Sequence, residues 1–203
     1  MKYGNITLGQ IEAGINKIGG EEAFLKLLRG ELVVSEPARL WREENGVIYF
    51  SVTSDGITGP HWIKRLEKKN PRLSKWAKDV LNSPDFKPTS STVYNCVVLK
   101  GEMFSNENRY TENIRAEADK RKLGKPNAEV ACLIRENFSD EEIEAMGLWW
   151  IVTMHEPIND SDGDPSLLNA SRNDEGRWLH ASYDNPSFRW HREDGFVFLA
   201  PQN

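Results

Sequence analysis

The sequence predicts an α+β fold with a helical segment at the N-terminus. Apolar residues recur at helical spacing before residue 30, and runs of β-branched and aromatic residues then alternate with further helical stretches. Towards the C-terminus only short strands are expected. A chain of 203 residues with 38% hydrophobic content is long enough for one sizeable core. We divide it into a helical segment, residues 1–34, and one α+β domain, residues 35–203.

Local signals place the elements in order. Between Ile11 and Leu28 the apolar spacing predicts two short helices, separated by Gly19-Gly20. Further helices are expected from Pro60 onward and over 73–83, 111–123 (capped by Thr111), 126–138 (with an early proline, Pro126) and 139–147, where Ser139 and Glu142 form a capping box. Strands are expected at 46–54, 92–100, 148–158, 176–184 and 195–200.

Several classes of protein are excluded by composition. No stretch approaches the roughly 18 apolar residues that a membrane span needs, so we expect no membrane insertion. The N-terminus has no apolar region typical of a secretory signal, which predicts a cytoplasmic protein, while display on a cell surface or virion stays open. The two cysteines, Cys96 and Cys132, lie in apolar runs and are predicted to be buried free thiols.

Negative charge gathers at the C-terminus. Residues 155–203 hold nine acidic residues and four arginines, a balance of −5 that equals the net charge of the whole chain. Such a surface repels phosphate backbones, so we expect no nucleic-acid partner. The alternative is a DNA-binding regulator that uses the two helices within residues 7–30.

A calcium loop is a weak candidate in the same region. Asp160, Asp162 and Asp164 have the alternate spacing of such a loop. However, Pro165 stands where the turn glycine is needed, and Ser171 stands where the closing acid is needed. We therefore predict no metal site.

No catalytic constellation stands out. The sequence lacks a G-x-S-x-G elbow and a phosphate-binding loop, and neither cysteine has a base nearby in sequence. We expect no enzymatic activity and no cofactor.

The C-terminal run resembles a specific family. Gly176-Arg177-Trp178, then Arg189-Trp190, then Gly195-Phe196-Val197-Phe198 resemble the end of the C-type-lectin-like domains that formylglycine-generating enzymes share with the variable proteins of diversity-generating retroelements. The resemblance covers about the last 35 residues and implies a C-type-lectin-like fold. The enzyme branch needs a pair of cysteines in the C-terminal half, and none follows Cys132. The variable-protein branch needs none.

In that second branch, adenine-rich codons at interspersed positions are randomised by mutagenic reverse transcription, while a frame of fixed residues holds the fold. The resemblance therefore implies a variable region over 168–195. The residues there that a mutable asparagine codon can reach are Asn169, Ser171, Asn173, His180, Ser182, Tyr183, Asn185, Ser187, Phe188, His191 and Asp194. We expect these side chains to point outward and contact a ligand, with Phe188 as a contact hot spot.

The implied frame consists of Trp178, Trp190, Gly195, Phe196 and Phe198, and its four aromatic residues are expected to be buried anchors. The whole pattern predicts a variable protein that binds a ligand, with an unknown protein or surface ligand as its partner. The rival is an enzyme of the formylglycine-generating fold with altered chemistry, whose site would lie around His155, Glu156 and residues 160–164.

Overall fold

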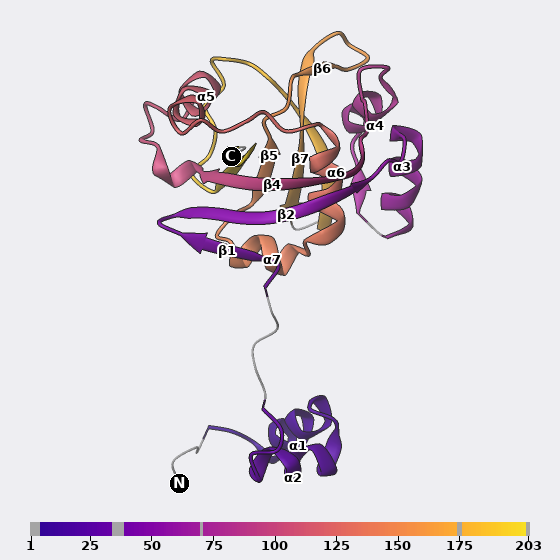
Figure 1. Ribbon diagram of the computed structural model, residues 1–203, viewed down its shortest axis with the longest axis vertical. Helices are drawn as coiled ribbons and strands as arrows, with labels where there is room; N and C mark the ends of the chain where they lie inside the picture. The colour runs from indigo at the N-terminus through magenta and orange to yellow at the C-terminus, as the bar shows by residue number, and fades with distance from the viewer. Residues whose placement is uncertain (1–4, 34–38, 70, 174–175, 202–203) are drawn as a thin grey trace. The chain divides into compact units, whose positions relative to one another are not determined.

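The structure, a computed structural model, describes residues 5–33, 39–69, 71–173 and 176–201 (Figure 1). The chain divides into two compact units, Met1–Arg39 and Leu40–Asn203. The boundary predicted between residues 34 and 35 lies outside the described residues, as do residues 174 and 175 of the predicted variable region.

Within the described residues the protein is mixed α+β, with seven α-helices and one nine-stranded sheet. The α-helices are α1 (Leu8–Lys17), α2 (Gly20–Leu28), α3 (Gly59–Lys68), α4 (Lys75–Asn82), α5 (Thr111–Lys120), α6 (Glu129–Asn137) and α7 (Asp140–Ala145). The strands are β1 (Trp41–Glu44), β2 (Val47–Asp55), β3 (Arg72–Leu73), β4 (Ser90–Lys100), β5 (Trp150–Thr153), β6 (Ile158–Asn159), β7 (Pro165–Asn173), β8 (Gly176–Tyr183) and β9 (Asp194–Leu199).

Each predicted helix and strand has a counterpart in the structure, with shifts at the ends. The single strand predicted over 148–158 is shorter: β5 covers only Trp150–Thr153, and Ile158 belongs to the separate strand β6. Strands β1, β3, β6 and β7 are additions that the sequence did not predict. Two predicted helix starts are wrong. Thr111 is the first residue of α5 and not its cap, because Tyr110 holds the cap position. Pro126 precedes α6, which begins at Glu129.

The N-terminal unit consists of two short helices. Thr7 caps α1 and forms a capping box with Gln10. Gly19 separates α1 from α2 and has a φ of +109°, in the left-handed region that glycine adopts without a steric penalty. Neither helix contains a buried residue.

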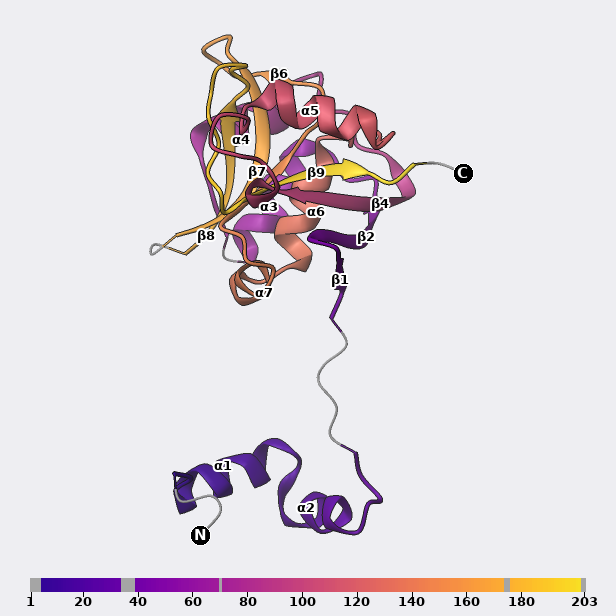
Figure 2. The same ribbon diagram turned by 90° about the vertical axis from the view of Figure 1, so that its left-hand side faces the viewer.

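The sheet has the strand order β1-β2-β4-β9-β5-β7-β8-β3, and β6 pairs with β7. Neighbouring strands are antiparallel except for β5 with β9 and β3 with β8, which are parallel. Strand β9 comes last among the strands, yet it lies inside the sheet between β4 and β5, and Figure 2 shows it beside β4. It therefore joins the strands of the first half to those of the C-terminal region.

Residues alternate between the two faces of the sheet, since the side-chain period of a strand is two. On one face, Val98 and Val197 belong to a large apolar cluster, and α3, α4 and α6 pack on this side. On the other face, Val97 and Phe196 pack with Ile114 of α5. The sheet thus has an apolar layer on each side.

A buried carboxyl group connects α6 to the strands beneath it. Glu129 has no exposed surface and accepts hydrogen bonds from Ser54 Oγ at 2.9 Å and from Tyr94 Oη at 2.6 Å. It also accepts from the backbone N–H and the hydroxyl of Thr89, at 2.9 and 2.7 Å. Burial, reinforced by the bond to Glu129, raises the pKa of Tyr94 well above its ordinary value.

Cys96 and Cys132 are buried and free, as predicted. Burial raises the pKa of the Cys96 thiol to about 12. Among the described helices, none combines the length and the apolar character that crossing a bilayer requires.

Candidate functional site

A row of four residues crosses the C-terminal part of the sheet. Trp150 on β5 is paired with Asp194 on β9 and, on its other side, with Ser171 on β7. Ser171 is paired in turn with Trp178 on β8. Residues paired across neighbouring strands present their side chains on the same face. The row lies on the face that carries Phe196, because Asp194 and Phe196 are two residues apart on β9.

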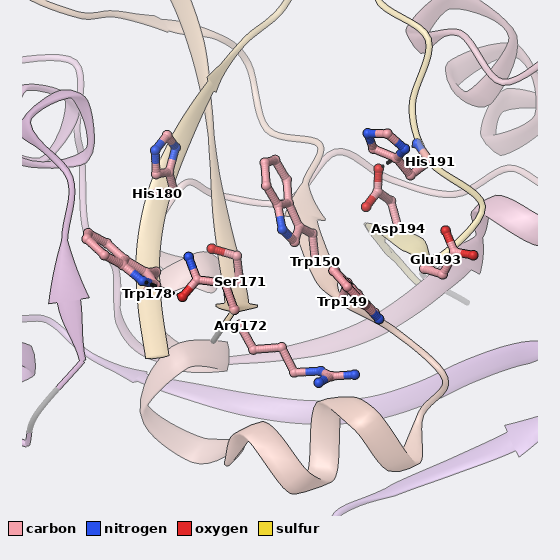
Figure 3. Close-up of a pocket in the computed structure, with 10 residues that line it drawn as sticks. Trp149, Trp150, Ser171, Arg172, Trp178, His180, His191, Glu193 and Asp194 are labelled. Atoms are coloured by element: carbon pink, nitrogen blue, oxygen red, sulfur yellow. Dashed lines mark hydrogen bonds between the residues drawn. The ribbon is translucent and has the colours of Figure 1, made fainter. Parts of the chain in front are cut away.

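This row forms the floor of a pocket of about 690 Å³, which is within the usual range for ligand-binding sites (Figure 3). Its lining comes from β5, β7, β8 and the start of β9. The lining residues are Trp149, Trp150, Ser171, Arg172, Asn173, Trp178, His180, His191, Glu193 and Asp194.

Two of the three pocket tryptophans carry an arginine over the ring. Trp149, 56% exposed, has the guanidinium carbon of Arg172 at 5.6 Å from its ring centroid. Trp178 has the corresponding atom of Arg72 at 5.4 Å. These are cation–π geometries, since both distances are below about 6 Å. Arg172 also donates from Nε to the carbonyl of Leu148 at 3.2 Å.

The third tryptophan, Trp150, stands beside His180. Their ring centroids lie 6.3 Å apart at an interplanar angle of 26°, and Trp76 of α4 lies 5.9 Å from His180 on another side. The contact between Nδ1 of His180 and the carbonyl of Ala181, 2.7 Å, requires the proton to be on Nδ1. Burial lowers the pKa of His180 below its ordinary value, so the imidazole is neutral at pH 7.

Asp194 is the buried acid of the pocket. It is 2% exposed, and Oδ2 accepts the backbone N–H of His191 at 2.8 Å. Burial raises the pKa of this carboxyl to about 6, partly offset by the bond from His191. In Figure 3 the carboxylate lies on the side of the pocket that faces Trp150.

Five of the eleven predicted variable positions line this pocket: Ser171, Asn173, His180, His191 and Asp194. Others lie near the end of β8 and in the loop that follows it. There Tyr183, Ser187 and Phe188 are exposed, whereas Ser182 and Asn185 are half-buried.

The expectation that all eleven side chains point into solvent is wrong for three of them. Ser171 and Asp194 are buried in the floor of the pocket. Asn169 has no exposed surface and donates to Ser182 Oγ at 3.0 Å, because its position in the middle of β7 is covered by neighbouring elements.

The expected burial is seen for three of the four aromatic frame residues. Trp190, Gly195, Phe196 and Phe198 are buried. A Cβ atom on Gly195 would lie 2.8 Å from side-chain carbons of Leu148 and Val98, so no larger residue fits there without a shift. Trp178 is not a buried anchor: it is half-buried and lines the pocket.

The acidic loop before β7 has a structural role. Asp160 Oδ1 accepts the backbone N–H groups of Asp162 and Asp164, at 2.9 and 3.1 Å, which folds the loop upon itself. Asp162 also lies 3.8 Å from Lys75 Nζ. In the described part of the chain, no three His, Cys, Asp or Glu side chains are grouped to hold a metal ion.

The site of the rival enzyme does not assemble. His155 is 2% exposed; its Nδ1 donates to the carbonyl of Glu156 at 2.6 Å, and its Nε2 accepts the N–H of Leu168 at 2.9 Å. Both ring nitrogens are therefore engaged with the backbone. Burial lowers the pKa of His155 to about 4. The Glu156 side chain points elsewhere, to Lys125 at 2.6 Å.

Sequence reasoning missed four of the pocket's contributors: Trp149, Trp150, Arg172 and Glu193. The two tryptophans were expected only as part of the strand over 148–158, and neither Arg172 nor Glu193 was assigned to a site. The sequence did contain a signal for the two tryptophans. Two adjacent tryptophans at the start of a strand place one ring on each side of the chain.

Comparison of the chain with models of protein families, with curated proteins and with solved structures gives no match.

Proposed function

We propose that this protein binds a ligand, a surface of another protein, through the pocket between β5, β7, β8 and β9. One observation carries the proposal: five residues whose types fit a diversified surface gather around three tryptophans in a single pocket. The finer assignments, a C-type-lectin-like fold and diversification by a retroelement, are part of the same proposal.

The chemistry of the lining supports binding. Tryptophan rings offer large rigid contact areas at a low entropic cost, and Ser, Asn and His offer adaptable hydrogen bonds. Trp149 is more than half exposed, which a chain does not need for its own stability.

The apolar layer on the opposite face of the sheet does not contain these side chains. Leu168, Leu179 and Val197, which alternate with pocket residues on β7, β8 and β9, are fully buried in the opposite layer. A substitution on the pocket face therefore leaves this layer in place. Such separation is what a binding surface with many tolerated sequences requires.

The proposal is tested by amplicon sequencing of the whole gene across a population of the source organism. We expect substitutions to concentrate at the codons of the variable positions, to spare Trp190 and Gly195, and, because of its burial, to spare Asn169. Exposed residues of the same types outside the region are the matched controls: Ser51, His61 and Asn95. If the variable codons change no more often than these controls, diversification is refuted.

A further inference from the structure

The pocket contains two acids, Glu193 and Asp194, and neither forms an ion pair within the described part of the chain. Most buried or half-buried acids elsewhere do so or are saturated by hydrogen bonds. Burial raises the pKa of Asp194, and the charge of Arg109, outside the lining, offsets this only in part. Asp194 Oδ2 is occupied by the N–H of His191, but Oδ1 makes no hydrogen bond within the described part of the chain. This buried carboxyl group therefore keeps one oxygen available to a ligand.

The one arginine of the lining does not compensate this charge. Arg172 donates to the carbonyl of Leu148, lies 3.7 Å from Glu144 and packs over Trp149. Its guanidinium is therefore engaged on the side of α7. His180 brings no positive charge at pH 7 because its ring is neutral.

The rings of the pocket already accept cations. Trp149 and Trp178 each carry an arginine of this chain over the ring. Over the ring of Trp150, in contrast, no arginine or lysine of the described chain is placed, and Trp150 is the register partner of Asp194. The ring of Trp150 stacks with the neutral ring of His180 but carries no cation of this chain. A tryptophan ring that no cation covers, beside a carboxylate without an ion pair, is a site for a cation.

The geometry of Asp194 favours one kind of cation. A guanidinium forms its strong paired bonds with both oxygens of one carboxylate, and here one oxygen is taken by His191. An ammonium group is a compact point charge that needs only one oxygen and a ring face.

We propose that the pocket binds an alkylammonium group, held between the ring of Trp150 and the carboxylates of Asp194 and Glu193; this inference rests on the proposed ligand-binding function. The group is either the side chain of a lysine on a protein partner or a free quaternary ammonium compound. The pocket, at about 690 Å³, has room for more than the cation itself.

The experiment is a tryptophan-fluorescence titration of the full chain with three small probes. Choline represents the quaternary source, n-butylammonium represents the lysine side chain, and 3,3-dimethyl-1-butanol has the shape of choline without its charge. We expect at least one cation to bind with a Kd on the order of 1–10 mM, about tenfold tighter than the neutral alcohol. Which cation binds tighter identifies the source.

Two variants locate the site. We expect Asp194→Asn, which keeps an acceptor for His191, to weaken cation binding about tenfold, and Glu193→Gln, at an exposed position, to weaken it about two- to threefold. Glu107→Gln removes an exposed acid outside the pocket and serves as the control with unchanged affinity. Circular dichroism and thermal unfolding verify that each variant is folded. If Asp194→Asn does not fold, Glu193→Gln still tests the site.

Three results would overturn the inference: no binding of either cation, equal binding of the neutral alcohol, or unchanged cation binding in both pocket variants. If the neutral alcohol binds as tightly as the cations, the pocket still binds ligands. That result would contradict the ammonium assignment but not the proposed ligand-binding function. Diversification is decided separately by the sequencing experiment.

Discussion

The indole N–H of Trp190 donates a hydrogen bond to Thr111 Oγ1 at 2.9 Å, and both side chains are 1% exposed. The bond fastens the segment between β8 and β9 to the first turn of α5. Trp190 also packs edge-to-face on Phe196, with ring centroids 5.7 Å apart, and on the exposed Phe188 at 4.8 Å. A single buried ring thus connects α5, the sheet and a predicted contact residue.

Replacing Thr111 by valine keeps the shape and removes the acceptor. We expect the free energy of unfolding to fall by about 1–3 kcal/mol, because the buried indole N–H is left without a partner. Urea denaturation followed by tryptophan fluorescence measures this. Thr53→Val, at an exposed strand position, is the matched control and should change stability by less than about 0.5 kcal/mol. Equal stability of the two variants would show that the bond contributes nothing.

His155 should oppose folding in acid. Its pKa is about 4 in the folded chain against 6.5 for the ordinary group, so the unfolded chain binds more protons between these values. Its stabilising contribution is complete above pH 6.5 and is lost as the pH falls towards 4, by about 3 kcal/mol in total. The ring resonances of His155 in NMR spectra should titrate near pH 4. A midpoint near 6.5 would contradict the burial of this ring.

Asp194 changes the pH dependence of the stability in the opposite direction to His155. Burial raises its pKa to about 6 from 3.8, so the folded chain binds more protons between these values, and its ionisation costs stability as the pH rises through this range. We expect Asp194→Asn to raise the free energy of unfolding by about 1–3 kcal/mol at pH 7.5 and to leave it unchanged near pH 4. Urea denaturation at both pH values measures this, with the exposed Glu193→Gln as control. Lower stability of Asp194→Asn at pH 7.5 would refute the assignment.

The start of α3 lies directly against the end of α4. A Cβ atom on Gly59 would be 1.7 Å from the carbonyl oxygen of Leu81. We therefore expect Gly59→Ala to lower the free energy of unfolding by about 3 kcal/mol or more, because backbone has to move. Gly124→Ala, whose Cβ would meet Leu199 at an ordinary 3.4 Å, is the control. Thermal unfolding compares them, and similar melting temperatures would contradict the close packing.

The contribution of the hydrogen bond from Tyr94 to Glu129 to the free energy of unfolding should be measurable on its own. Tyr94→Phe leaves one oxygen of a buried carboxyl with fewer donors, so we expect a loss of about 1–2 kcal/mol. Tyr49→Phe, on the neighbouring strand and half-buried, is the matched control and should be close to neutral. Chemical denaturation of both variants measures the change in the free energy of unfolding. If Tyr94→Phe causes no change, the stabilising hydrogen bonds of this cluster come from Ser54 and Thr89.

Much of the fold could be predicted because its signals are local. The helices have apolar spacing or caps, and β2, β4 and β9 are runs of β-branched and aromatic residues. The missed strands lack such signals. β3 and β6 have two residues each, and β1 reads Trp-Arg-Glu-Glu, which is exposed after its first residue.

Strand β7 was missed for a different reason. Its Asn169 and Ser171 are residues that favour loops, and Pro165 begins it. They are accommodated because β5 and β8 pair with β7 on both sides, Ser171 lines the pocket, and Asn169 is hydrogen-bonded to Ser182. Tertiary contacts overrode local preference at this site.

The pocket itself could be predicted only in part. Five contributors from β7 onward were expected as contact residues through the family resemblance, and Trp150 was not among them. Its place beside Ser171 and Asp194 depends on strand register, and a shift of one residue would move it to the opposite face. Register is a long-range property that a single sequence does not display.

The position of β9 inside the sheet sets an order of events during synthesis. Strands β4 and β5 have no direct pairing, and β9 is the partner that each of them shares. A nascent chain that has not yet produced residues 194–199 therefore exposes two unpaired strand edges, which are sites of aggregation. The complete sheet forms only after β9 has left the ribosome, so a chaperone that shields those edges should improve the yield of this protein in cells.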